Sequence, residues 1–257
     1  MLADLLVGFA AGLLIATLTA PVGVSGAVFV LPVQLSVLGV PNPAVTSTNL
    51  LYNVIATPGA LLRYRRDGLL LTPLTRLLVA GTLPGVVLGA LVRVYLLPGP
   101  DTFRVVAGLV LLALGGWLVG RTMRPPRALR PLGPRAIVVL ALGVGLVGGV
   151  YGIGGGSLLS PVLVGSGMTL AAVAPAALAS TFLTSLVGAA SFTVLATVAP
   201  GPVAPDWPVG IACGLGGLVG GYLGARLQPH LPERGLRVLL GVLAAVVGAL
   251  YLAQGVS

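Results

Sequence analysis

The stretch Val150-Tyr151-Gly152-Ile153-Gly154-Gly155-Gly156-Ser157-Leu158-Leu159-Ser160-Pro161 contains four glycines in five consecutive positions. Glycine destabilises a helix interior by about 1 kcal/mol relative to alanine, so the cluster predicts irregular backbone rather than one continuous helix. Long apolar runs flank it on both sides. Inside a bilayer, irregular backbone is tolerated only where protein surrounds it or where it lines a polar cavity. The stretch therefore predicts a broken helix that handles a solute.

The composition places the whole chain in a membrane. Of its 257 residues, 57% are hydrophobic and only 7% are charged, and the mean hydropathy is +1.10. Soluble domains carry about 25% charged residues, so this chain could not cover a surface that faces water. Strand-like alternation is absent, which disfavours a membrane β-barrel. We expect an all-α, multi-pass protein of the cell inner (cytoplasmic) membrane. Its first apolar run lacks the basic start of a signal peptide and is expected to be retained.

Apolar runs separated by Pro, Gly and charged residues predict a polytopic helical bundle with about 8–10 membrane segments. The runs are 5–20, 23–39, 45–63, 72–97, 102–120, 136–151, 153–168, 170–199, 207–228 and 235–254. A spanning helix needs about 20 residues, and the first two runs of each half are shorter than that. The sequence leaves open whether the short segments within 5–39 and 136–168 are tilted spans or re-entrant pairs.

The two halves of the chain resemble each other. A shift of 129 positions aligns Gly23, Gly26 and Pro32 with Gly152, Gly155 and Pro161. Shifts of 135 and 133 align further glycines: Gly81, Gly85 and Gly89 with Gly216, Gly220 and Gly224, and Gly108 and Gly115 with Gly241 and Gly248. We expect a first repeat at 1–120, an Arg-rich cytoplasmic linker at 121–135 and a second repeat at 136–257. The ladders of glycines spaced by four are expected to be helix-packing seams.

The charge distribution predicts the orientation of the repeats. The net charge of +9 arises from 14 basic residues, all of them arginines, and five acids. Arginines gather in the loop after 45–63, in the linker and near 226–237, and cytoplasmic loops are enriched in such residues. Five segments per half would then give the halves opposite orientations, as in inverted-repeat transporters, with both termini outside. Treating each short pair as one kinked span would make the repeats parallel, and the charge pattern favours the inverted arrangement.

Few residues could support catalysis. The acids are Asp4, Asp67, Asp101, Asp206 and Glu233, the only histidine is His230, and all lie in loops or at the ends of runs. No cluster suits a metal, a cofactor or acid–base chemistry, so we expect no catalytic residues and no enzyme. Because the arginines lie in a few loops, the basic charge reflects membrane orientation and not nucleic-acid binding. The lone Cys213 excludes an intrachain disulfide and is expected to be a buried hydrophobe.

The glycine-rich break offers a different kind of site. A helix that begins inside a membrane presents free N–H groups and the positive end of its dipole, which together bind anions without a charged side chain. Close helix packing is the alternative explanation of the glycines. Asn49 and Asn53 lie four residues apart on one predicted helix face, and they either line the site or join helices by hydrogen bonds. The candidate substrate-binding residues are Gly152, Gly154, Gly155, Gly156, Ser157, Gly23, Ser25, Gly26, Asn49, Asn53 and Tyr151.

These features resemble the TauE/SafE sulfite-exporter family of membrane permeases. The resemblance is carried by Gly152-Ile153-Gly154-Gly155-Gly156 with Pro161 five residues on, by the duplicated halves and by the length. The first half departs from the family pattern, because Ser25 and Ala27 stand where a fuller glycine cluster is expected. The resemblance implies transport of sulfite or a small organosulfonate across the cytoplasmic membrane.

These features are compatible with two functions. The first is a secondary transporter that exports a small sulfur-containing anion by alternating access, with the lipid bilayer and this solute as its partners and no nucleic acid. The alternative is a membrane scaffold without transport activity, whose glycines serve helix packing alone. The sequence leaves the coupling ion and homo-oligomer formation open.

Overall fold

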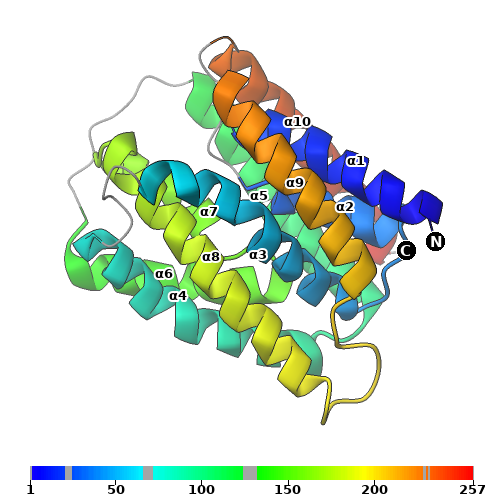
Figure 1. Ribbon diagram of the computed structural model, residues 1–257. Coiled ribbons are helices and arrows are strands. Elements are labelled where there is room, and N and C mark those ends of the chain that lie inside the picture. The colour runs from blue at the N-terminus through cyan, green and yellow to red at the C-terminus, as the bar shows by residue number, and fades with distance from the viewer. Residues whose placement is uncertain are drawn as a thin grey trace.

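The computed structural model describes residues 2–20, 25–65, 72–123, 132–227, 230 and 232–256. Within these ranges the regular structure is helical, and no strand occurs there (Figure 1). The first half contains α1 (Leu2–Thr19), α2 (Ala27–Ser36), α3 (Ala44–Arg65), α4 (Pro73–Leu91), the π-helix η2 (Val92–Leu96) and α5 (Pro100–Met123). The second half contains α6 (Pro134–Tyr151), α7 (Gly156–Gly165), α8 (Leu170–Leu195), α9 (Trp207–Leu227) and α10 (Glu233–Val256).

The predicted all-α membrane fold is confirmed. Seven helices within the described residues are long and apolar enough to cross a membrane. Helix α3 has 22 residues but carries the polar sequence Thr46-Ser47-Thr48-Asn49 near its start. Helices α2 and α7 have 10 residues each, which at 1.5 Å per residue is about 15 Å, or half of the hydrocarbon thickness. Neither short helix can span the bilayer by itself.

Local sequence explains where several helices begin and end. Thr72 caps α4 by accepting a hydrogen bond from the backbone N–H of Thr75, and Pro73 occupies the first turn, where its missing N–H costs nothing. Proline also starts α6, directly after Gly133. The predicted linker at 121–135 overlaps the last residues of α5 and the first residues of α6, and its middle lies outside the described residues.

Helix packing follows the same pattern in the two halves. Helix α1 packs along α9 and α4 packs along α6, while α3 contacts α9 and α8 contacts α4. In the same way α2 packs on α3 and α7 packs on α8. If each helix number is raised or lowered by five, the contact of α1 with α9 becomes that of α6 with α4, α3 with α9 becomes α8 with α4, and α2 with α3 becomes α7 with α8. The contacts of α1–α4 with other helices therefore match those of α6–α9.

The glycine ladders are packing seams, as predicted. A Cβ added to any of these glycines would lie 2.0–2.6 Å from a backbone carbonyl oxygen of the neighbouring helix, so only glycine permits the observed approach. The ladder Gly81, Gly85 and Gly89 of α4 faces Val138, Leu142 and Leu146 of α6, and the ladder Gly216, Gly220 and Gly224 of α9 faces Phe9, Leu13 and Thr17 of α1.

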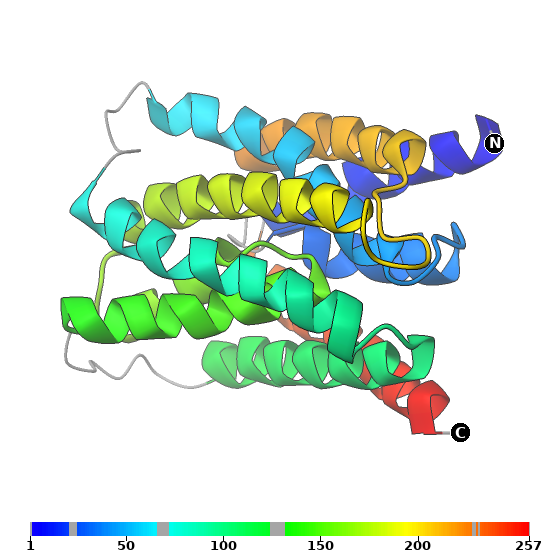
Figure 2. The ribbon, with the colours of Figure 1, turned by 90° about the horizontal axis from the view of Figure 1, so that it is seen from below.

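The long helices lie side by side along a common direction, and both termini are at the same end of the bundle (Figure 2). Helices α5 and α10 run antiparallel, because Gly108 faces Gly248 and Gly115 faces Gly241. The end of the bundle away from the termini holds most of the described arginines, which are Arg63, Arg65, Arg76, Arg121, Arg135, Arg226, Arg234 and Arg237. The end with the termini holds Arg93, Arg104, Asp101 and Asp206.

Candidate functional site

The predicted break between two helices is present. Helix α6 ends at Tyr151 and α7 begins at Gly156. Between them Gly152 has φ 85° and Gly154 has φ 65°, values in the left-handed region that residues with a Cβ rarely adopt. Helix α7 starts at the N-cap Gly155, which provides no side-chain cap for the amides of the first turn. The break lies deep in the protein, because residues 151–156 are all buried.

Buried hydroxyl groups from α4 and α8 surround this break. A Cβ added to Gly154 would lie 2.6 Å from Ser185 Oγ, and one added to Gly155 would lie 2.5 Å from Thr82 Cγ2. At Gly156 it would lie 1.8 Å from the carbonyl oxygen of Ala177 and 2.3 Å from Thr181 Oγ1. We call the hydroxyl side chains around the break the hydroxyl cluster; its members are Thr82, Ser180, Thr181, Thr184 and Ser185.

Most of the hydroxyl cluster is internally hydrogen-bonded. Thr82 Oγ1 lies 3.0 Å from Ser180 Oγ and accepts a hydrogen bond of 2.8 Å from Thr184 Oγ1. Ser185 Oγ is fully buried and has no hydrogen-bond partner within the described chain. A buried hydroxyl without a partner is costly, and such groups commonly mark a place where water or a ligand binds. Among the described residues, Ser185 is thus the member of the cluster whose buried hydroxyl has no partner.

Sequence reasoning did not select Thr82 as a site residue. It lies within the glycine ladder of α4, where the apolar run and the packing motif dominate the pattern. Its position in the cluster depends on α4 crossing α8, and local sequence carries no signal for that contact. The other four members of the cluster lie in the apolar run 170–199, where four hydroxyl residues within six positions are a signal that the sequence itself carries.

Asn49 connects the break at residues 152–155, the second-half break, to the start of α2 at Ala27, which we call the first-half break. Its side-chain amide donates one hydrogen bond of 2.9 Å to the carbonyl oxygen of Ala27, at the start of α2, and another of 3.0 Å to that of Gly152. Both amide hydrogens are therefore used, while Oδ1 is buried without a partner in the described structure. Of the two predicted roles for Asn49, hydrogen bonding between helices is the one observed.

The first-half break has a different chemical lining. Ser25 Oγ donates a hydrogen bond of 2.9 Å to Asn53 Oδ1 and accepts one of 3.2 Å from the backbone N–H of Ala27. Asn53 Nδ2 is buried and lacks a partner among the described residues. Gly26 is the N-cap of α2, and a Cβ added there would lie 2.3 Å from the phenolic oxygen of Tyr52. The predicted site residue Gly23 lies outside the described residues, as does the side chain of Ser157.

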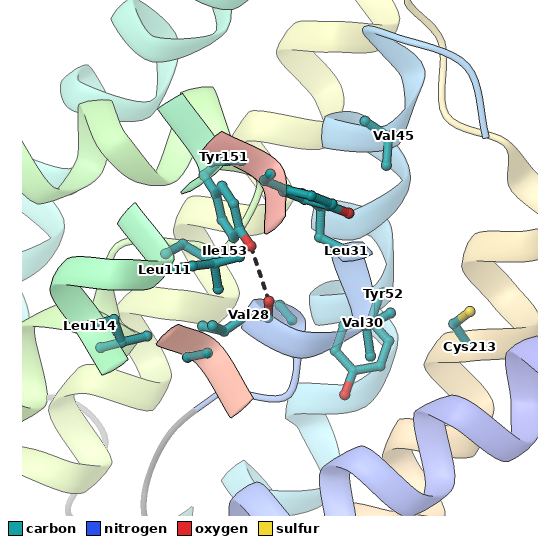
Figure 3. Close-up of a cluster of buried hydrophobic side chains, with 14 of the residues drawn as sticks. Val28, Val30, Leu31, Val45, Tyr52, Leu111, Leu114, Tyr151, Ile153 and Cys213 are labelled. Atoms are coloured by element: carbon teal, nitrogen blue, oxygen red, sulfur yellow. Dashed lines mark hydrogen bonds between the residues drawn. The ribbon is translucent and has the colours of Figure 1, made fainter. Parts of the chain in front are cut away.

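Tyr151 joins the end of α6 to the start of α2. Its hydroxyl donates a hydrogen bond of 3.1 Å to the carbonyl oxygen of Val28 (Figure 3). In a regular helix that carbonyl would accept from the residue four positions later, which here is Pro32 and has no N–H. Tyr151 therefore supplies the donor that proline removes. Its ring also stacks on Phe103, with ring centroids 6.4 Å apart.

No group of three or more His, Cys, Asp or Glu side chains suited to a metal ion occurs among the residues that the structure describes. The two breaks are instead lined by neutral polar groups, which are the hydroxyl cluster, the amides of Asn49 and Asn53, and the backbone at the starts of α2 and α7. Such groups can bind a solute by hydrogen bonds and helix dipoles but offer no metal or acid–base chemistry.

Comparison with known proteins gives a family. The model of the family described as Sulfite exporter TauE/SafE matches residues 8–251. The chain is also 27% identical over 124 residues to the probable membrane transporter protein YunE of Bacillus subtilis (strain 168). That alignment covers 46% of this chain and 41% of the relative.

The family match extends over both halves and includes both helix breaks. It agrees with the apolar helices in showing a multi-pass transporter of the cell inner membrane rather than an enzyme. Because the match takes in nearly the whole chain, this protein belongs to the Sulfite exporter TauE/SafE family of membrane transporters.

Proposed function

We propose that the protein is a secondary transporter that exports a small sulfur-containing anion, such as sulfite or an organosulfonate, across the cytoplasmic membrane by alternating access. The family description supports sulfite and export. The observation that carries the anion argument is the start of α7 at the uncapped Gly155, beside the unpartnered hydroxyl of Ser185. A helix N-terminus with a nearby hydroxyl donor suits a negatively charged solute.

The site residues divide by what they can still donate. The backbone amides at Gly154–Ser157 and the Ser185 hydroxyl are the proposed contacts at the second-half break. At the first-half break, Asn53 Nδ2 has no partner in the described structure and can donate to the solute. Both amide hydrogens of Asn49 already bond to carbonyl oxygens, so its proposed role is to hold the two breaks together. Packing against Ala177 explains glycine at position 156 without any ligand.

We also propose that the two halves, 1–120 and 136–257, form an inverted duplication. The corresponding helices α5 and α10 run antiparallel, and Gly108 and Gly115 of one meet Gly248 and Gly241 of the other reciprocally. An inverted repeat places equivalent structures on opposite sides of the membrane, which is the usual basis of alternating access. The arginine-rich end of the bundle is proposed to face the cytoplasm, with both termini outside.

Transport by purified protein in lipid vesicles tests the proposal. Sulfite, thiosulfate, methanesulfonate and acetate would be offered in turn. We expect flux of one or more of the sulfur oxyanions and little of acetate. Absence of flux for all four anions, from protein shown to be folded, would contradict a transporter of this substrate class.

A matched pair of serine variants tests the site itself. Ser185→Ala removes a hydroxyl that has no partner among the described residues, so the melting temperature should not fall while flux drops by about tenfold, the worth of one hydrogen bond to a charged group. Ser191→Ala, on the same helix, removes a hydroxyl that donates to the carbonyl of Val187 at 2.8 Å, and flux should be unchanged. Wild-type flux in Ser185→Ala would refute the assignment of the anion to this break.

A further inference from the structure

Arg93 is a fully buried arginine in a segment that is otherwise apolar. It lies in the π-helix Val92–Leu96, at the end of a membrane-spanning stretch that covers Pro73–Leu96. Its relative exposure is 0%, and it is the largest of the fully buried side chains described. Its side chain lies inside the bundle, near the end that holds both termini.

The recorded neighbours of the Arg93 guanidinium are neutral. Nε donates a hydrogen bond of 3.1 Å to Thr46 Oγ1, and the two terminal nitrogens donate to the carbonyl oxygen of Leu97 and to Asn42 Oδ1. The guanidinium carbon also lies 4.0 Å from the ring centre of Phe103. At this end of the bundle Arg104 forms an ion pair with Asp101, and both side chains are partly exposed.

A buried cation without a counter-charge is unusual. Transfer of an ion out of water is expensive unless an opposite charge accompanies it, and an ionisable residue within a membrane segment commonly marks the path of a charged solute. The π-helix is a second indication, because π-turns are rare and occur frequently at functional sites. A guanidinium has five N–H groups, and the three recorded bonds leave up to two of them for a ligand.

Arg93 is directly connected to the second-half break. Thr46 Oγ1, which accepts the hydrogen bond from Arg93, donates one of 3.2 Å to the carbonyl oxygen of Val150. Val150 lies two residues before Gly152, whose carbonyl oxygen is held by Asn49, one helical turn along α3 from Thr46. Arg93 lies four residues beyond Gly89, which meets Gly149 of α6, toward the end of the bundle that holds both termini.

We propose that Arg93 forms a second anion site, which receives the sulfonate or sulfite group of the solute between the break and the terminal end of the bundle. This inference rests on the proposed function, because it takes the same class of solute. The planar guanidinium can bind two oxygens of an –SO3 group at once, as it does with carboxylate and phosphate. The solute supplies the negative charge that no described residue places beside Arg93.

The test compares Arg93→Gln, Arg93→Lys and the control Arg104→Gln. Transport of sulfite and methanesulfonate is measured in vesicles, and thermal unfolding is measured in detergent with and without each anion. In Arg93→Gln we expect a KM about tenfold higher or more and loss of the anion-induced rise in melting temperature. Arg93→Lys keeps the charge but loses the bidentate hydrogen bonding of the guanidinium, so its KM should rise less than that of Arg93→Gln. Arg104→Gln should behave as the wild type in both assays.

A purely structural role for Arg93 predicts different results. Arg93→Gln would then melt at a lower temperature and keep both the wild-type KM and the anion-induced rise, which would overturn the proposal and leave the site at the glycine break intact. If Arg93→Gln cannot be recovered folded, Arg93→Lys decides, and an unchanged KM for both anions overturns the proposal. A wild-type protein that responds to neither anion would instead overturn the proposed function together with this site.

Discussion

The short helices α2 and α7 both begin after a glycine N-cap, but the side chains around the two N-caps differ. With the 129-residue shift, Gly26 corresponds to Gly155, and both are N-caps of a 10-residue helix. An added Cβ would lie 2.3 Å from the Tyr52 hydroxyl at the first position and 2.5 Å from Thr82 Cγ2 at the second. The first break thus faces a buried phenol, and the second faces small hydroxyl side chains. Among the described residues, the unpartnered hydroxyl of Ser185 lies at the second break and the unpartnered amide nitrogen of Asn53 at the first.

The sharpest difference between the breaks is at the first residue of each short helix. Gly156 corresponds to Ala27, which is fully buried and accommodates its methyl group. Gly156→Ala would place a Cβ 1.8 Å from the backbone carbonyl oxygen of Ala177. Because backbone of α8 cannot yield as a side chain can, we expect a loss of about 3 kcal/mol of stability, more than the roughly 1 kcal/mol that alanine gains in helix propensity. Thermal unfolding in detergent would measure this.

The reverse substitution, Ala27→Gly, serves as the control for Gly156→Ala. It removes a buried methyl group and lowers helix propensity, so it should cost about 1 to 2 kcal/mol. An unchanged melting temperature in Gly156→Ala would show that α7 can move away from α8 freely, and the tight second break would then not be a fixed feature of the fold.

The second difference is the amide that joins the breaks. Asn49 has Leu178 at the corresponding position of the second half, so the bridge exists once. Asn49→Ala leaves the carbonyl groups of Ala27 and Gly152 without this donor, and we expect a loss of about 2 kcal/mol. Asn53→Ala removes one recorded hydrogen bond, from Ser25, and should cost less. Equal melting temperatures for Asn49→Ala and the wild type would refute the bridging role.

Much of the architecture could be predicted from the sequence because it depends on glycine. The break at Gly152–Gly155 needs residues that accept positive φ, and the seam at Gly81, Gly85 and Gly89 needs residues without a Cβ. Both requirements appear directly as clusters or as four-residue spacing. Helices α1–α10, within the residues that the structure describes, accordingly follow the ten apolar runs, although α2 and α7 are shorter than the runs that predicted them.

The polar lining was less predictable because it depends on contacts between distant segments. Thr82 and Arg93 both lie in the apolar run 72–97, and nothing local distinguishes a hydroxyl that meets α8 from one that faces lipid. Arg93 did carry a signal, an arginine within that run and close to its end, but an arginine near a loop is usually exposed. Its burial results from the π-turn and from Phe103 on the next helix, which local composition does not encode.

A double substitution at Gly26 and Tyr52 tests whether the Tyr52 hydroxyl is the reason for glycine in the first break. Gly26→Ala should cost about 1.5 kcal/mol, because the new Cβ would lie 2.3 Å from the Tyr52 hydroxyl. The next atom of the ring, Cζ, is 3.4 Å away, so Tyr52→Phe relieves most of the clash. Thermal unfolding of the two single variants and the double variant would give their interaction energy. A double variant as unstable as the sum of the single ones would exclude this contact as the reason for glycine at position 26.

The smallest expected effect concerns Tyr151, which, like Asn49, forms a hydrogen bond between the second-half break and α2. Tyr151→Phe keeps the stacking on Phe103 and removes the donor to the Val28 carbonyl, which Pro32 cannot replace. Single hydrogen bonds between membrane helices contribute about 0.6 to 1 kcal/mol, so the melting temperature should fall slightly. If Tyr151 serves packing and not the solute, the KM for sulfite stays at the wild-type value. A raised KM with an unchanged melting temperature would instead place the phenol in the solute's path, and the two breaks would then line a single shared site.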